Sequence, residues 1–528
     1  MLVKICSSAL YGVDAFPVTV EVSVDKGQGY CLTGLADDTI RESWHRLNIA
    51  IRSNDYLMPR TRVTVNLAPA DIRKSDAAFD LPMAVGILAA SEQMTHLEKL
   101  PEYMLLGELG LDGHIYPVKG ALPVAIMALK KGFKGLLLPV ANATEAAVVK
   151  DLQVYGVQTL KEVIGFLQGD TPLEPITLNV RETFYAAQQD ADLDFKEVKG
   201  QQAVKRALEI TAAGGHNAVM IGPPGVGKTM LAKRLPTILP PFTLREALET
   251  TKIYSVAATG HPIHGLINKR PFRQPHHTIS DVALVGGGSS PLPGEISLAH
   301  NGVLFLDEMP EFKRTVLEVL RQPLEERKVT IARAKMALEF PSSFTLLASM
   351  NPCHCGYHNH PVHRCSCSPK AIQNYLQKIS GPLLDRIDLH IEVLPVSIDE
   401  LSSRSNKGES SAEIRARVIR ARETQAERYR DTGIYCNAQM SGKELALYCD
   451  MEPHAKKMFF HKMQLLQLSA RAHDRILKVS RTIADLAGSE KIELEHIAEA
   501  LSYRRLDRIP DVKSTEKMKK DAAYPYAV

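Results

Sequence analysis

The stretch IGPPGVGKTM, from Ile221 to Met230, decides the fold of this chain. It overlaps the end of the apolar run AVMIG, which has the composition of a buried strand. A glycine-rich loop between a strand and a helix can wrap backbone N–H groups around phosphates, and the helix dipole adds to this attraction. The loop consists of Gly222, Pro223, Pro224, Gly225, Val226, Gly227, Lys228 and Thr229. This order matches G-x-x-x-x-G-K-[ST] and predicts a site for ATP.

Polar residues at the ends of two further apolar runs complete the predicted site. Lys228 would reach the outer phosphates, and the Thr229 hydroxyl would bind Mg²⁺. In VLFLDE, Asp307 would hold the Mg²⁺ shell and Glu308 would activate the attacking water. Asn351 ends LLASMN and would orient that water near the γ-phosphate. Taken alone, the acidic residues also fit a solvated pair, and Asn351 fits an ordinary turn residue; the phosphate loop favours the catalytic roles.

The same apolar runs predict an α/β fold with a parallel sheet. Helical patterns lie between successive runs, as in a sheet with helices on its faces. The runs are Ala218 to Gly222, Gly302 to Glu308, Phe344 to Pro352 and Asp388 to Val393. After about Leu394 the pattern is helical, with amphipathic stretches at Ser411 to Arg430 and Leu468 to Gly488. We expect the arginines of the first stretch to form a solvated face with acidic neighbours.

The first 168 residues predict a separate α/β unit. Val18 to Val24 and Arg62 to Pro69 alternate as strands do, and Asp38 to Ser53 has a helical period. The expected boundaries are 1–168 for this unit, 169–193 for a linker, 194–395 for the nucleotide-binding core, 396–510 for a helical unit and 511–528 for a flexible tail.

Composition and charge limit the function classes. The net charge of +4 is small, so any contact with nucleic acid must come from local basic patches. The N-terminus lacks the apolar stretch of a signal peptide, and the longest apolar run, near Leu81 to Ala90, is too short to cross a bilayer. We therefore expect a cytoplasmic protein without a membrane partner. Its eight cysteines should be mostly reduced there, so clustered ones indicate a metal site.

Four of the cysteines cluster directly after Asn351. NPCHCGYHNHPVHRCSC contains Cys353, Cys355, Cys365 and Cys367 as two C-x-C pairs around a short loop. Four thiolates suit a closed tetrahedral Zn²⁺ site with a structural role. Free thiols in a mobile loop and an iron–sulfur cluster are alternatives, and nearby histidines could substitute as ligands.

Longer motifs carry a family resemblance. The order of phosphate loop, LFLDE, strand-end Asn351 and LLDRIDL resembles an AAA+ ATPase. RPFRQPHHTISDVALVGGG and PLPGEISLAHNGVLFLDEMPEF resemble its magnesium-chelatase-like branch. With the N-terminal unit and the cysteine insert, the chain is similar to the ComM/YifB competence protein family almost from end to end.

The resemblance implies an AAA+ core with a C-terminal helical lid, and a hexameric ring whose ATP sites lie between subunits. It implies Asn351 as sensor 1 and Arg386 as an arginine finger that acts on a neighbouring subunit. Arg471 of the lid would be sensor 2, with Arg475, one turn away, as the second choice. From its sequence context alone, Arg386 also fits a surface salt bridge.

The segment EERKVTIARAKMALEFP, from Glu325 to Pro341, predicts two strands around a basic turn. In related ring helicases a hairpin at this place lines the central pore, so the resemblance implies that Arg333 and Lys335 hold DNA phosphates. Such contacts do not depend on base sequence and weaken with salt. The alternative is a solvated edge hairpin with protective charges.

Within the N-terminal unit, GELGLDGHIYPVKGAL, after KSDAAFDLP, resembles the proteolytic domain of Lon proteases. That chemistry needs a serine nucleophile and a lysine base. In this chain Ala78 stands at the serine position and Leu122 at the lysine position, and neither side chain can do this chemistry. We therefore expect a non-proteolytic domain of the type found in Lon and in ribosomal protein S5 domain 2.

Together these patterns predict an ATP hydrolase that acts as a DNA motor, and the family resemblance implies a helicase for branch migration during recombination of DNA in natural transformation. Its cofactors would be ATP, Mg²⁺ and structural Zn²⁺, and its partners branched or single-stranded DNA and further copies of itself. The alternative is a magnesium-chelatase-type ATPase that remodels a partner protein. An ATP-dependent protease and a nucleotide-gated scaffold are lesser alternatives.

Overall fold

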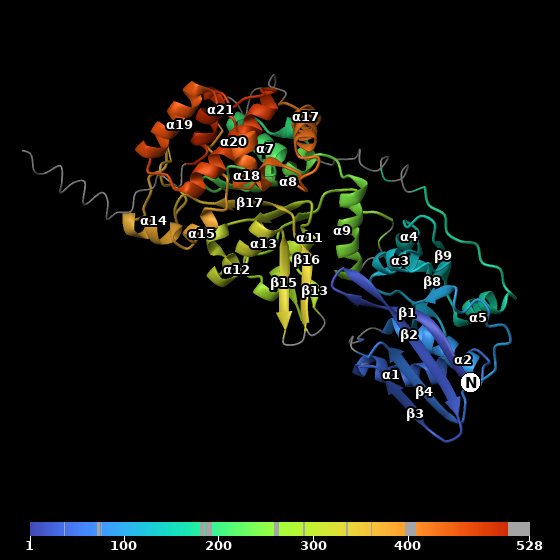
Figure 1. The fold of residues 1–528 in the computed structure, drawn as a ribbon. Coiled ribbons are helices and arrows are strands. Elements are labelled where there is room, and N and C mark those ends of the chain that lie inside the picture. The colour runs from blue at the N-terminus through green and yellow to red at the C-terminus, as the bar shows by residue number, and fades with distance from the viewer. Residues whose placement is uncertain are drawn as a thin grey trace, which may run out of the picture.

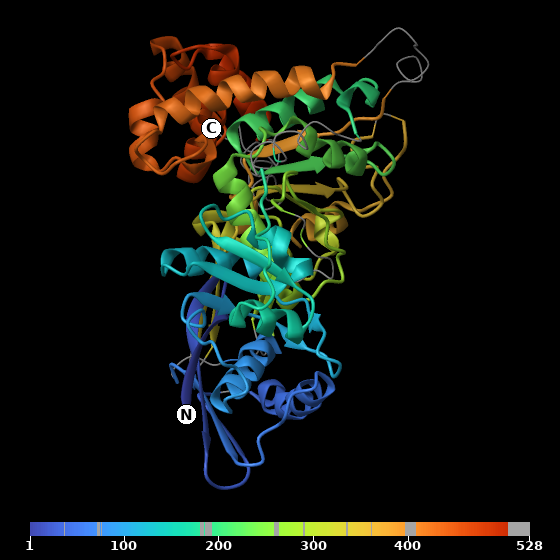
Figure 2. The same ribbon diagram turned by 90° about the vertical axis from the view of Figure 1, so that its right-hand side faces the viewer.

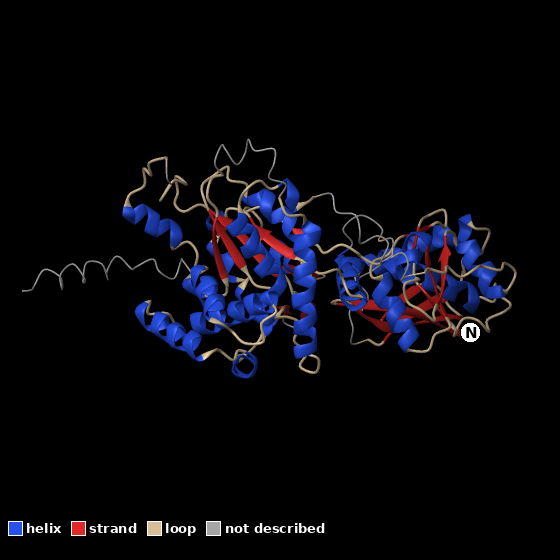
Figure 3. Ribbon diagram, turned by 90° about the horizontal axis from the view of Figure 1, so that it is seen from above, coloured by secondary structure: helices blue, strands red, loops and turns tan. Residues whose placement is uncertain are grey.

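The computed structural model describes residues 1–35, 37–70, 74, 77–179, 184, 193–257, 263, 265–288, 291–333, 336–360, 362–396 and 408–504. The expected tail at 511–528 and Lys335 lie outside these residues. The N-terminal unit lies at one end, the nucleotide-binding core in the middle and the helical lid at the other end (Figure 1, Figure 2). Figure 3 shows two separate groups of strands, each with helices around it. The predicted α/β fold class is confirmed.

A five-stranded sheet forms the middle of the core, in the order β11-β14-β17-β10-β18. Each neighbouring pair runs parallel. The strands are β10 (Ala218–Ile221), β11 (Phe272–Arg273), β14 (Val303–Leu306), β17 (Thr345–Met350) and β18 (Leu389–Glu392). Leu304 and Phe305 belong to two different apolar clusters, because successive side chains of a strand point to opposite faces. Both faces are thus buried, which explains the unbroken apolar sequences of these strands.

Helices and short antiparallel strand pairs surround this sheet, among them β12 (Gly286–Gly287) with β13 (Leu292–Pro293). The helices are α7 (Gln202–Gly214), α8 (Lys228–Ile238), α9 (Leu244–Ala257), α12 (Arg314–Glu318), α13 (Arg321–Glu326), α14 (Pro369–Leu376) and α15 (Gly381–Leu384). The predicted hairpin consists of β15 (Lys328–Arg333) and β16 (Met336–Pro341). Since β10, β14 and β17 are parallel, their carboxyl ends meet at one end of the sheet and bring the residues after them together.

Among the described residues 408–504, the α-helices of the lid are α17 (Ser411–Arg428), α18 (Gly442–Tyr448), α19 (Pro453–Leu465), α20 (Ala470–Ala487) and α21 (Leu494–Ser502). Helix α20 packs against α21, α17 and the core helix α7. Ile476 of α20 and Leu389 of β18 lie in the same apolar cluster. The lid is therefore joined to the sheet by a continuous apolar core.

The arginines of α17 correct one expectation. Arg417 pairs with Glu209 of α7 and with Glu409, and Arg428 pairs with Asp485 of α20. A solvated face is therefore wrong for these two arginines. The ion pairs with Glu209 and Asp485 connect α17 to α7 and α20 instead, because these two carboxylates lie on helices that the sequence does not place beside α17.

The N-terminal unit is built on a seven-stranded sheet in the order β3-β4-β2-β1-β5-β8-β9. Its strands are β1 (Leu2–Tyr11), β2 (Asp14–Asp25), β3 (Tyr30–Thr33), β4 (Arg62–Ala68), β5 (Tyr103–Leu105), β8 (Gly135–Pro139) and β9 (Gln153–Val157). Its helices are α1 (Asp38–Ser53), α2 (Asp80–Ala90), α3 (Ala121–Lys130), α4 (Val140–Ala146) and α5 (Leu160–Gln168). Helix α2, which contains the longest apolar run, is buried along its whole length. Within the described ranges, no helix has the length and apolar character that crossing a membrane requires.

An apolar joint connects the N-terminal unit to the core. Helix α3 packs against α9, and the Gly120 N–H donates to the carbonyl O of Ser255 at 3.0 Å. Leu122 is fully buried here, in a small apolar cluster that Leu248 of α9 contacts. Ala78 is buried as well. Ala78 and Leu122, at the positions that the Lon resemblance assigns to the serine and the lysine, therefore lie in apolar clusters.

We expect Leu122→Ala to lower the free energy of unfolding by about 2–5 kcal/mol, because it removes buried methyl groups and leaves a cavity in the joint. Urea or thermal unfolding of the full-length protein measures this change. Leu57→Ala is the matched control, since that side chain is 77% exposed and its loss should change stability by less than about 0.5 kcal/mol. Equal stability of the two variants would contradict a buried joint.

Candidate nucleotide site and arginine pocket

The phosphate loop curls around the Lys228 ammonium group. Gly225 and Gly227 have φ angles of 81° and 85°, a left-handed backbone that glycine adopts without strain. Helix α8 begins at Lys228, whose Nζ donates to the carbonyl O of Gly222 at 2.6 Å and of Pro223 at 2.9 Å. Burial lowers the pKa of this ammonium group, against the opposing effect of two nearby carboxylates. The loop thus holds a cation where the phosphates of a nucleotide are expected.

Two predicted Mg²⁺ ligands meet beside this loop. Thr229 Oγ1 donates to Asp307 Oδ2 at 2.9 Å. A hydroxyl and a carboxylate are oxygen ligands of the kind that Mg²⁺ prefers, so this donor set fits the ion. Ser349 Oγ donates to the other oxygen of Asp307 at 2.5 Å and accepts a hydrogen bond from the Glu308 N–H at 3.1 Å. Ser349 therefore holds the Asp307 carboxylate and the backbone of Glu308, and no local sequence pattern points to this serine.

The remaining predicted residues lie at the same end of the sheet. Lys228 Nζ donates to Asn351 Oδ1 at 3.0 Å, so the residue after β17 reaches the phosphate loop. Glu308 is exposed and has a φ of 52°, which is uncommon for a residue with a side chain. Strained backbone of this kind clusters at active sites. The structure thus brings the two acidic residues and Asn351 to the loop that carries Lys228.

The cysteine insert has the geometry of a metal site. One Sγ atom from each of Cys353, Cys355, Cys365 and Cys367 lies within 4.8 Å of the others. The Sγ–Sγ distances among the first three are 3.3, 3.5 and 3.7 Å. Zn–S bonds of about 2.3 Å in a tetrahedron separate the sulfurs by about 3.8 Å, so the four thiols fit zinc. Backbone hydrogen bonds, first from Tyr357, lower the pKa of Cys355 to about 5, whereas burial raises the pKa of Cys353.

The insert also contacts the phosphate loop. Gly356 lies between the two cysteine pairs, and a Cβ added to it would lie 2.6 Å from Cδ of Pro224. The tight turn of the insert therefore packs against the loop itself. The sequence places the cysteines close to Asn351 but gives no sign of this contact.

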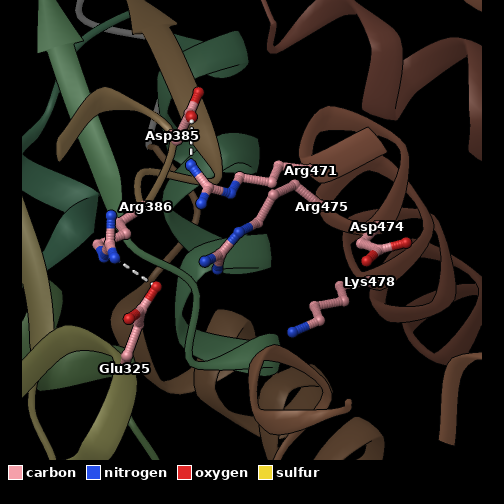
Figure 4. Close-up of a pocket in the computed structure, with 7 residues that line it drawn as sticks. All are labelled: Glu325, Asp385, Arg386, Arg471, Asp474, Arg475 and Lys478. Carbon is pink, nitrogen blue, oxygen red and sulfur yellow. Dashed lines mark hydrogen bonds and ion pairs between the residues drawn. The ribbon is translucent and has the colours of Figure 1, made fainter. Parts of the chain in front are cut away.

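A second charged site, the arginine pocket, contains both predicted arginines. Figure 4 shows Arg386 beside Arg471 and Arg475, which extend from lid helix α20. The residues that line it are Glu325, Asp385, Arg386, Arg471, Asp474, Arg475 and Lys478. Arg386 is buried and pairs with Glu325 at 2.5 Å. It therefore forms a salt bridge, but this salt bridge does not leave the arginine on the surface as the sequence alternative expected. Arg471 is exposed and pairs with Asp385 at 3.2 Å.

The arginine pocket lies at the opposite end of the sheet from the phosphate loop. Strands β10 and β18 are parallel neighbours, with Ala218 opposite Leu389 and Ile221 opposite Glu392. The loop follows the last residue of β10, whereas Arg386 precedes the first residue of β18. The length of the paired strands, about 10 Å, thus separates the two sites. At their own end of the sheet, Arg386, Arg471 and Arg475 pair with carboxylates, namely Glu325, Asp385 and Asp388.

The β15–β16 hairpin lies beside the N-terminal unit (Figure 1). Tyr11 Oη, at the end of β1, donates to the carbonyl O of Ala337 in β16 at 3.2 Å. Lys328 and Glu339 pair across the hairpin at 2.7 Å. Arg333 is the last residue of β15, next to the turn. The turn residue Lys335 lies outside the described residues.

Comparisons with known proteins extend over nearly the whole chain. The family model described as "Magnesium chelatase, subunit ChlI" matches residues 194–401, "Subunit ChlI of Mg-chelatase" matches 20–142, and "Magnesium chelatase, subunit ChlI C-terminal" matches 408–504. The chain is 45% identical over 511 residues to Competence protein ComM of Haemophilus influenzae, covering 96% of this chain and 98% of that protein. It is 42% identical to the uncharacterized protein YifB of Escherichia coli, over 95% of this chain and 96% of that protein.

The chain belongs to the ComM/YifB family. Its core is therefore an AAA-type ATPase of the magnesium-chelatase kind, followed by a C-terminal helical unit of the same kind. This ComM/YifB family member is also similar to Lon proteases, in agreement with the resemblance predicted from its sequence. It is 28% identical over 159 residues to Lon protease 2 of Bacillus subtilis, which covers 26% of each chain.

We expect the purified protein to carry about one zinc ion per chain, and Cys365→Ser to lose it because the site then lacks one thiolate. Elemental analysis of the folded protein measures the metal. Cys31→Ser changes a cysteine of strand β3 in the N-terminal unit, so this control should retain the zinc. A folded wild-type protein without metal would contradict the zinc site, and iron in place of zinc would favour the iron–sulfur alternative.

Proposed function

We propose that this protein is an ATP-driven DNA motor that works as a hexameric ring and promotes branch migration during recombination of transforming DNA. The separation of the phosphate loop from the arginine pocket carries the proposal. One chain cannot bring both sites to the same nucleotide, because they follow and precede neighbouring parallel strands. Copies arranged side by side in a ring would therefore share each ATP.

Residues of one subunit would bind the nucleotide and direct the water. Lys228 holds the outer phosphates, and Asn351 orients the attacking water. Glu308 accepts a proton from that water as the bond to the γ-phosphate breaks. Mg²⁺ bound by Thr229 and Asp307 would neutralise charge on the phosphates.

The neighbouring subunit would supply positive charge. Arg386 would act as the arginine finger that stabilises the charge of the transition state. Arg471 would serve the same shared nucleotide, since it lies in the arginine pocket with Arg386. In this proposal sensor 2 acts between subunits rather than on the ATP of its own chain.

DNA is the proposed substrate of the motor. Arg333 ends β15, and Lys335 lies two residues further along the sequence. Both would hold phosphates in the ring centre. The Haemophilus influenzae relative is named a competence protein, which supports a role with incoming DNA. The alternative is a motor that remodels a partner protein, and the matches to magnesium chelatase subunits favour it.

A branch-migration assay with a four-way DNA junction tests the motor. We expect Lys228→Ala to lose strand movement because the phosphates lose their cation. Glu308→Gln should still bind ATP, but the rate of ATP hydrolysis should fall by about 10²–10⁴-fold, because no carboxylate then accepts the proton of the attacking water. Glu311→Gln is the control and should remain active, because this exposed carboxylate pairs with Lys378 rather than with a residue of the phosphate loop. Strand movement by Lys228→Ala would contradict the role of the loop.

Salt titration of DNA binding tests the hairpin. We expect the double variant Arg333→Ala, Lys335→Ala to bind forked DNA more weakly and with a shallower salt dependence, the slope of log K against log salt falling by about 1.4–1.8. Fluorescence anisotropy at several salt concentrations measures both. Lys328→Ala, which removes a hairpin charge that already pairs with Glu339, should leave the slope unchanged. Unchanged DNA binding by the double variant would favour the protein-remodelling alternative.

A further inference from the structure

The Arg386 side chain is held inside its own subunit. Its Nη1 donates to the carbonyl O of Pro382 at 2.5 Å, and its Nη2 pairs with Glu325 at 2.5 Å. Only 9% of the arginine side chain is exposed, against 53% of Glu325. In this position the guanidinium faces a carboxylate of its own chain, so a phosphate on another subunit would have to compete with that carboxylate.

The bonding of Arg386 is also incomplete. Its Nε is buried and has no hydrogen-bond partner among the residues that the structure describes. A buried donor without an acceptor costs free energy, so this side chain gains from a position in which an anion accepts from all of its N–H groups. A phosphate offers several such oxygens. The retracted position is therefore one from which an anion can draw Arg386 away.

The carboxylates that pair with the arginines of this pocket differ in how readily their ion pairs can break. Asp388, which pairs with Arg475 at 2.8 Å, is fully buried and would be left as an unsolvated charge. Glu325 is half exposed, and water can solvate its carboxylate as soon as Arg386 leaves. Of these two ion pairs, the one between Glu325 and Arg386 is therefore the exchangeable one.

Glu325 connects the arginine pocket to the hairpin (Figure 1, Figure 4). It lies on α13, which ends at Glu326, and β15 begins at Lys328. Arg327 alone separates the helix from the strand. The Arg327 carbonyl O accepts from the Ser342 N–H at 2.8 Å, and its guanidinium donates to Ser343 Oγ at 3.1 Å. These bonds clamp the base of the hairpin to the end of α13. A displacement of the hairpin therefore also displaces Glu325.

We propose that Glu325 is a positioning residue that couples the hairpin to Arg386. In the absence of DNA it keeps the arginine retracted. A DNA strand that pulls on the hairpin moves Glu325 away, and Arg386 is then available to the phosphates of the ATP bound by the neighbouring copy. This coupling rests on the proposed function, and it adds that DNA sets the supply of positive charge for hydrolysis.

ATP turnover of the full-length protein, with and without saturating forked DNA, tests the coupling. We expect Glu325→Gln to raise turnover without DNA by about two- to fivefold, the effect of losing one partly exposed ion pair, and to reduce stimulation by DNA to the same extent. Glu326→Gln is the matched control, because it changes the next residue, whose carboxylate accepts from Gln322 rather than from an arginine. It should behave like the wild type.

Two further variants separate positioning from folding. Arg386→Ala should stop DNA-stimulated turnover, and Glu325→Gln combined with Arg386→Ala should be as inactive as Arg386→Ala, because Glu325 acts only through Arg386. Wild-type turnover that DNA does not change would contradict the proposed function, and with it the coupling. A stimulated wild type together with Glu325→Gln that matches it in both conditions would overturn the coupling alone.

Discussion

The parallel pairing of β10 with β17 on one side and β18 on the other is the constraint on which the functional geometry depends. Backbone hydrogen bonds set this register, and both faces of the sheet are buried, so the strands cannot slide without exposing their apolar side chains. One end of the sheet then collects Lys228, Asp307 and Asn351. The other end collects Arg386. The two chemical sites of one chain are therefore kept apart by the same contacts that stabilise its core.

A buried ion pair network fixes the lid to this sheet. Asp388 accepts from the Asn217 N–H at 3.0 Å and pairs with Arg475 of α20 at 2.8 Å, and Nδ1 of His216, whose pKa burial lowers, lies 3.4 Å from the carboxylate. Burial by itself raises the pKa of this carboxyl, but Arg475 and His216 outweigh burial and hold the pKa well below its usual range. Removing one partner would leave a buried charge, at a cost of about 3–5 kcal/mol. Arg475 is thus a fixed point between lid and sheet, whereas Arg471 and Arg386 have partners that water can reach.

Local signals account for what the sequence predicts well. The helix at Asp38 to Ser53 has the predicted bounds because its apolar period and acidic start are read from neighbouring residues. The sequence patterns that predict the phosphate loop and strands β15 and β16 are likewise formed by neighbouring residues. Ser349 could not be found in this way, since its contact with Asp307 depends on the register that sets Leu306 opposite Ala348. The pair of Glu325 with Arg386 joins distant parts of the chain, and each residue alone reads as an ordinary surface charge.

The joint at Leu122 also limits which side chains this position can carry. The Lon resemblance assigns the reactive lysine to this position, and here a fully buried leucine packs between α3 and α9 instead. A lysine at this position would place a cation between two packed helices, where solvent cannot reach it. The reactive amine and the attachment of the N-terminal unit to the core are therefore alternative uses of the same buried position.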